Sequence, residues 1–144
     1  MKYLTKSRFK LAAECPTKLF YTGKKLYANK SLDNPFLEAL ADGGFQVGEL
    51  AKYYYPDGQN IHTLEYEEAL NLTNHLLEQE NVTIFEAAVK FKDLFIRVDI
   101  LVKRGSQIRI IEVKSKSIDE RMGDSFLTKN GEGILAEWKP YLYD

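Results

Sequence analysis

The sequence predicts a protein of the α/β class with an α+β-type order, in which N-terminal helices precede a three-stranded antiparallel meander. Apolar residues recur at helical spacing in the first half of the chain, and after residue 81 they alternate as in strands. The length of 144 residues, 44% of them hydrophobic, suits one core. We therefore expect a single domain over residues 1–144.

Three helical regions open the chain. Residues 7–21 read as a short helix that turns and restarts at Cys15-Pro16, because proline cannot continue a helix interior. A second helix is expected after Asn34-Pro35, with Gly43-Gly44 as its end. Residues 45–54 then form a further apolar helix, which carries Glu49.

The clearest amphipathic helix is predicted over residues 63–78. Its apolar stripe consists of Tyr66, Ala69, Leu70, Thr73, Leu76 and Leu77. His75 lies at the edge of this stripe, where a partly buried, hydrogen-bonded histidine is favoured over a ligand.

Three strands follow, over residues 82–91, 94–103 and 107–114. Lys92-Asp93 and Gly105-Ser106 separate them, and Gly-Ser suits a two-residue type II′ hairpin loop. Lys92-Asp93 is a poor loop of this length, and a one-residue slip there would move every side chain to the other face.

The two loops set the register of three acidic residues. If each loop has two residues, facing positions sum to 185 (92 + 93) in the first hairpin and to 211 (105 + 106) in the second. Asp99 then faces Glu86 on one side and Glu112 on the other, and Lys114 projects from the same face as Glu112. Like charges at this spacing repel, so either solvent screens them or a divalent cation binds them; we favour the cation.

Charge is unevenly distributed along the chain. Residues 1–30 contain eight Lys or Arg and one acidic residue, although the whole chain has a net charge of −1. Such a basic arm suits phosphate groups, with Lys6, Arg8, Lys10 and Lys18 as candidate nucleic-acid contacts, while a merely solvated helix face is the alternative.

Cysteine and histidine are too scarce for several classes of protein. Cys15 is the single cysteine, so no internal disulfide can form, and a buried structural thiol is its expected role. With only His62 and His75 beside it there is no structural zinc set. Neither a signal peptide nor a membrane span is recognisable, which predicts a cytoplasmic protein without a membrane partner.

Asp99, followed after twelve residues by Glu112-Val113-Lys114, resembles the D…(D/E)xK signature of the PD-(D/E)XK nuclease superfamily, more narrowly its RecB-like branch. The segments 4–9 and 15–21 are similar to the start of RecB-like nucleases and of iron–sulfur exonucleases associated with CRISPR systems. Within that group the chain looks like the N-terminal part of a bacterial domain family whose function is not established. The resemblance implies a restriction-endonuclease-like core.

The resemblance also implies roles for particular residues. Asp99 and Glu112 match the metal-binding acids, Lys114 the catalytic lysine, and Glu86 the acid on the preceding strand. Glu49 is the best match to a further metal ligand on a helix, with His62 as a rival. The implied activity is hydrolysis of phosphodiester bonds in nucleic acid, DNA rather than RNA, with Mg²⁺ or Mn²⁺ as cofactor.

The chain departs from these relatives at two places. A fourfold cysteine set for an iron–sulfur cluster is incomplete, because Cys15 stands alone. Residues 138–144 look like the beginning of a helix, which suggests a truncated domain from a longer protein that itself carries the activity.

Two functions of other classes stay open. One is a nucleic-acid-binding module that holds phosphates through its basic arm without cleaving them. The other is a scaffold on a degenerate nuclease fold, with residues 115–133 as a loop that receives a partner. We favour the nuclease, because a domain without catalytic duty has little reason to keep Asp99, Glu112 and Lys114 on one sheet face.

Overall fold

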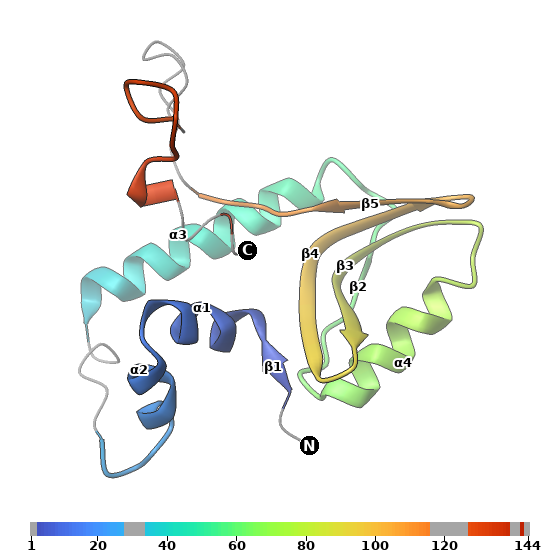
Figure 1. Cartoon of the computed structure of the whole chain (residues 1–144). Coiled ribbons are helices and arrows are strands. Elements are labelled where there is room, and N and C mark those ends of the chain that lie inside the picture. The colour runs from blue at the N-terminus through green and yellow to red at the C-terminus, as the bar shows by residue number, and fades with distance from the viewer. Residues whose placement is uncertain (1–2, 28–33, 116–126, 139–141, 143–144) are drawn as a thin grey trace. The chain divides into compact units, whose positions relative to one another are not determined.

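The structure is a computed structural model that describes residues 3–27, 34–115, 127–138 and 142 (Figure 1). The chain divides into two compact units, one of residues 1–5 with 23–115 and one of residues 6–22 with 116–144. Over the described ranges the fold has four α-helices and a mixed five-stranded sheet. The expected mixture of helices and strands is thereby confirmed at this coarse level.

The first unit contains the whole sheet. Its strands are β1 (Leu4–Thr5), β2 (Gln59–Asn60), β3 (Asn81–Phe91), β4 (Leu94–Arg104) and β5 (Gln107–Ile111). The order is β1-β4-β3-β2, and β5 also pairs with β4. The predicted meander is the antiparallel part, β3-β4-β5, while the two-residue strands β1 and β2 add parallel pairs to β4 and β3.

The predicted register of the meander is confirmed. Pairs between β3 and β4 run from Asn81↔Arg104 to Phe91↔Leu94, and every one sums to 185. Pairs between β4 and β5 run from Ile100↔Ile111 to Arg104↔Gln107, and every one sums to 211. Gly105 has a φ of 55°, as the first loop position of a type II′ turn requires, and Lys92 takes the same role in the other hairpin with a φ of 53°.

The third strand of the meander is shorter than expected. β5 ends at Ile111 rather than at Lys114. The reason is local, because the backbone N–H of Val113 donates to the side chain of Asp99 and not to a strand carbonyl.

The helix α3 (Pro35–Lys52) corrects a second prediction. Asn34 caps its first turn, accepting a hydrogen bond of 3.0 Å from the Phe36 amide. Gly43-Gly44 does not end it, and no separate helix begins at Phe45. Neither glycine has a positive φ, so both stay helical at a penalty of about 1 kcal/mol each relative to alanine.

The helix α4 (Tyr66–Leu76) packs against β3 and covers one side of the sheet (Figure 1). Its predicted apolar stripe is largely confirmed, since Ala69, Leu70 and Thr73 are buried. The core around it consists of Tyr3, Ile61, Ala69, Leu70, Val82, Ile84, Ala87, Ala88, Phe95, Val98 and Leu101. The expected burial of His75 is wrong: its side chain is 77% exposed, with Nδ1 3.5 Å from Glu78.

The second unit contains α1 (Lys6–Glu14) and α2 (Pro16–Tyr21). The break between them at Cys15-Pro16 is as predicted. The Cys15 thiol is exposed, which corrects the expectation of a buried one. The backbone amides of Lys18 and Thr17 lower the pKa of this thiol, because they point at its sulfur from the first turn of α2.

The C-terminal part of the second unit has little regular structure among its described residues. A single bridge joins Leu127 to Ile134, and residues 136–138 form a short 3₁₀ helix. Most of the loop expected over residues 115–133, and most of the helix expected over residues 138–144, lie outside the described residues.

Candidate active site at the ends of β4 and β5

Asp99 and Val113 join two neighbouring strands just beyond their last pair. The β4–β5 ladder ends at Ile100↔Ile111, so Asp99 is the next residue along β4. Its Oδ2 accepts a hydrogen bond of 2.7 Å from the Val113 backbone N–H. A charge-assisted bond of this kind holds the carboxylate against the chain that leaves β5.

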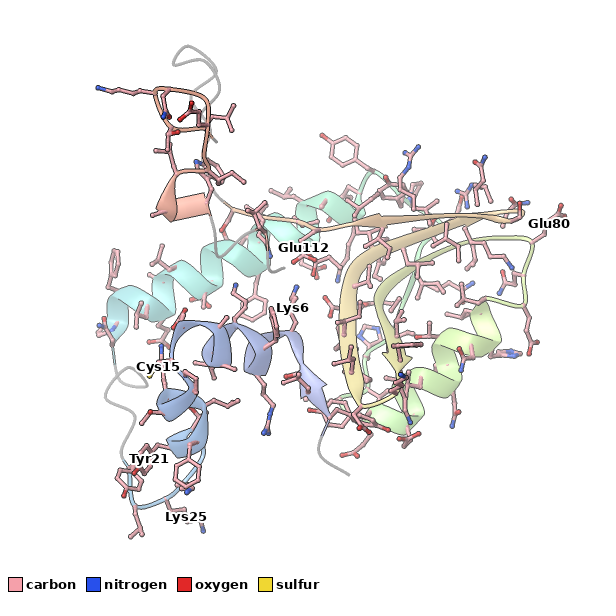
Figure 2. All side chains as sticks on the ribbon, viewed as in Figure 1. Lys6, Cys15, Tyr21, Lys25, Glu80 and Glu112 are labelled. Carbon is pink, nitrogen blue, oxygen red and sulfur yellow. The ribbon has the colours of Figure 1, made fainter. Side chains whose placement is uncertain are left out.

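Glu112 and Lys114 are the residues on either side of Val113. Lys114 Nζ lies 2.5 Å from Glu112 Oε1, and the two side chains are 34% and 27% exposed, respectively. Figure 2 shows Glu112 on the segment that leaves β5. The structure therefore brings the backbone positions of Asp99, Glu112 and Lys114 together, with water able to reach the last two side chains.

Glu86 faces Asp99 in the register but has an unusual backbone. Its φ is 56°, in the left-handed region that a non-glycine residue rarely adopts, and the ladder is interrupted there. Glu86 Oε2 lies 3.5 Å from Nε of Arg97, on the neighbouring strand β4. Glu86 thus has a cation beside its carboxylate, which reduces the repulsion expected from a row of three acids.

Arg97 was not among the residues predicted for the site. Its Nη1 donates to the Thr63 carbonyl at 2.7 Å and its Nη2 donates to the Ile61 carbonyl at 2.8 Å. Arg97 shares the face of Asp99 because it is two residues away on the same strand. That alternation is the one sequence signal that would have placed a cation beside these acids.

Two residues were candidates for a further metal ligand, Glu49 and His62. Among the described residues, the contacts that the structure gives them do not include Asp99 or Glu112. Glu49 Oε1 lies 2.6 Å from Lys52 Nζ, one turn later on α3. Glu49 also lines a pocket with Lys52, Tyr53, Tyr55, Pro56 and Phe85. His62 is exposed directly after Ile61.

A cation at this site would depend on few protein ligands. Over the described part of the chain, no three His, Cys, Asp or Glu side chains form a group suited to a metal ion. Asp99 and Glu112 remain as two carboxylates on joined segments. Their hard oxygen atoms fit Mg²⁺, which commonly binds one or two carboxylates and completes its shell with water and substrate phosphates.

The predicted phosphate contacts of the basic arm lie in the second unit. Lys6, Arg8 and Lys10 belong to α1, and Lys18 belongs to α2. Lys18 Nζ is 2.8 Å from Glu14 Oε2, which also lowers the pKa of that carboxyl group through their hydrogen bond and charge. Lys18 is therefore partly neutralised.

Comparisons with known proteins do not identify a family for this chain. No family model, no curated protein and no solved structure matches the chain. None of the described helices is long and apolar enough to span a membrane.

Proposed function

We propose that the protein is a metal-dependent nuclease, with Asp99, Glu112 and Lys114 as its catalytic residues and DNA as the expected substrate. The observation that supports this is the 2.7 Å hydrogen bond from the Val113 amide to Asp99 Oδ2. It ties an acid of one strand to the backbone between an acid and a lysine of the next. Phosphodiester hydrolysis needs such a combination of anionic ligands and a nearby cation.

Asp99 and Glu112 would hold Mg²⁺ or Mn²⁺. Asp99 uses Oδ2 for the Val113 amide, and a carboxylate has a second oxygen for a cation. When bound, such a cation activates water and offsets the negative charge of the scissile phosphate. Glu86 is the less suitable ligand of the predicted set, since Arg97 lies against its carboxylate.

Lys114 supplies a positive charge of the chain itself. Its side chain is 34% exposed, and its ammonium group lies beside Glu112. An ion pair this close to solvent contributes at most about 1 kcal/mol, so a phosphate oxygen can compete for the lysine. There Lys114 would donate a hydrogen bond as negative charge develops on the phosphate, or orient the attacking water.

The test combines cation binding with cleavage. We expect calorimetry to detect Mn²⁺ binding by the wild type, loss of one or more sites in Asp99→Asn, and no loss in Lys114→Gln. Cleavage of labelled DNA in Mg²⁺ should fall at least about 100-fold in both variants, the scale of a lost catalytic group. Glu78→Gln is the matched control, because it neutralises a carboxylate that is 77% exposed on the α4 side.

Two results would contradict the nuclease. One is Mn²⁺ binding that Asp99→Asn leaves unchanged, and the other is cleavage that persists in EDTA. Salt-sensitive DNA binding that survives in Asp99→Asn, without cleavage by the wild type, would support the binding module instead.

A further inference from the structure

A groove beside the β4–β5 hairpin combines two arginines with a tyrosine. Its volume is about 520 Å³, and the residues that line it are Tyr55, Val102, Arg104, Gln107, Ile108 and Arg109. Arg104 pairs with Gln107 next to the hairpin loop. Val102 pairs with Arg109 two residues along, so the register places both arginines on the same face of the sheet. We refer to this site as the hairpin groove.

The hairpin groove has a net positive charge. None of the described residues that line it is acidic. Within the same part of the chain, neither arginine has a carboxylate partner; Arg104 Nη1 donates only to the Lys103 carbonyl, at 2.8 Å. A guanidinium group is a planar donor that fits the oxygens of a phosphate group. The charge therefore complements a phosphate-bearing ligand.

Exposed aromatic rings lie directly next to the groove. Tyr55 lines both the hairpin groove and the neighbouring pocket of about 230 Å³ that contains Lys52 and Tyr53. Tyr53 and Tyr54 are 81% and 84% exposed at the end of α3. Exposed tyrosine rings offer flat faces on which unpaired bases stack, at about 1–3 kcal/mol per base.

We infer that the hairpin groove binds the backbone of single-stranded nucleic acid, with phosphates on Arg104 and Arg109 and bases stacked on Tyr53, Tyr54 or Tyr55. Single strands are favoured over duplex because only unpaired bases expose their faces to such rings. The choice of nucleic acid as the anion rests on the proposed function. The groove shares no lining residue with the proposed catalytic residues or with the basic arm.

The experiment measures binding of a labelled oligothymidylate to the full chain by fluorescence anisotropy, in EDTA so that no cleavage occurs. We expect Arg104→Gln/Arg109→Gln to weaken binding about tenfold at low salt, and to reduce the slope of log K against log salt by about 1.4, which is 0.7 for each of two phosphates. Tyr53→Ala/Tyr54→Ala should weaken binding about fivefold or more, as expected for one lost stacking contact.

The matched control is Lys92→Asn/Lys129→Gln, which removes two exposed positive charges that are not among the residues lining the groove. Its affinity should stay within about twofold of the wild type, because the released counterions come from contacts at the groove. Absence of binding by the wild type, an unchanged affinity in the arginine variant, an equal loss in the control, or tighter binding of a duplex would each overturn the inference.

The outcomes for the groove and for the nuclease are distinguishable. Binding that depends on Arg104 and Arg109, without any cleavage, would support the hairpin groove as a binding site and contradict the proposed nuclease activity. Cleavage that depends on Asp99, with the affinity of Arg104→Gln/Arg109→Gln unchanged, would support the nuclease activity and contradict the binding site.

Discussion

Asp99 accepts a hydrogen bond from the backbone amide of Val113 at the point where the pairing between β4 and β5 ends. A side chain thus takes the place of the next ladder partner, and β5 stops at Ile111 while its chain stays beside β4. This gives Asp99 a structural role in addition to its proposed catalytic one. The two roles make different predictions for stability.

Replacing Asp99 tests the structural role. Asp99→Ala leaves the Val113 amide without its acceptor, and we expect the free energy of unfolding to fall by roughly 1–2 kcal/mol. Asp99→Asn keeps a carbonyl oxygen at this position and should lose less. Urea unfolding of the apo protein measures both. If repulsion among the carboxylates dominated instead, Asp99→Ala would be more stable than the wild type.

Arg97 should contribute more to stability than the acid beside it. Its guanidinium satisfies the carbonyls of Ile61 and Thr63, and its side chain is only 23% exposed. We expect Arg97→Met to lower the free energy of unfolding by roughly 2–3 kcal/mol, because two charge-assisted hydrogen bonds are lost. The control is Glu86→Gln, at less than about 1 kcal/mol, since Glu86 is 42% exposed. Comparable decreases in the free energy of unfolding of the two variants would contradict the larger contribution assigned to Arg97.

Thr73 connects α4 to β3 through a buried hydroxyl. Its Oγ1 accepts from the Ala88 backbone N–H at 2.9 Å and donates to the Ala69 carbonyl at 2.9 Å, while the residue is 1% exposed. Thr73→Val preserves the shape but leaves the Ala88 amide unsatisfied, which we expect to lower the free energy of unfolding by roughly 1–3 kcal/mol.

Thr73→Ser separates the hydroxyl from the methyl group at this position. It keeps the bond to Ala88 and should lose only about 1 kcal/mol through the missing methyl. Thermal or urea unfolding ranks the two variants. A serine variant less stable than the valine variant would show that packing, rather than the hydrogen bond, holds α4 on the sheet.

The meander was predictable because two independent patterns agree on it. Gly105-Ser106 sets the second hairpin by loop chemistry alone. Lys92-Asp93 does not, yet the first hairpin keeps the predicted register, since apolar residues on both faces of β3 and β4 would be misplaced by a one-residue slip. Lys92 therefore adopts a φ of 53° under the constraint of the strands it joins.

Other features depend on backbone positions that no side-chain pattern reports. The two-residue strands β1 and β2 are too short for any periodicity. The partners of Arg97 are carbonyl groups of a segment far away in the sequence. The continuous α3 arises because two glycines kept helical dihedral angles, a choice that glycine leaves open. At the candidate site, the register that brings β5 beside β4 as far as Ile111 was predicted, whereas the Val113 hydrogen bond and the cation beside Glu86 were not.

Lys90 connects the C-terminal end of β3 to Tyr3, which precedes β1. Its Nζ donates a hydrogen bond of 2.9 Å to the Tyr3 hydroxyl, which in turn donates to the carboxylate of Glu67. The bond to Tyr3 raises the pKa of Lys90 above its ordinary value, since it favours the charged amine. Tyr3 itself is 5% exposed and packs against Tyr66 and Phe95, so this bond connects the core to the surface.

A raised pKa in the folded state makes this contribution to stability depend on pH. The contribution is fully present below the unfolded pKa of lysine, about 10.4, and is lost as the pH rises through the higher folded value. We expect the wild type to be more stable than Lys90→Met at pH 8, and the difference to shrink above about pH 10.5. Lys92→Met is the comparison variant, because Lys92 contacts the Phe91 ring rather than a hydroxyl. Urea unfolding at several pH values measures both variants. A pH-independent effect of Lys90→Met would mean that the aliphatic stem of Lys90 matters more for stability than its charge.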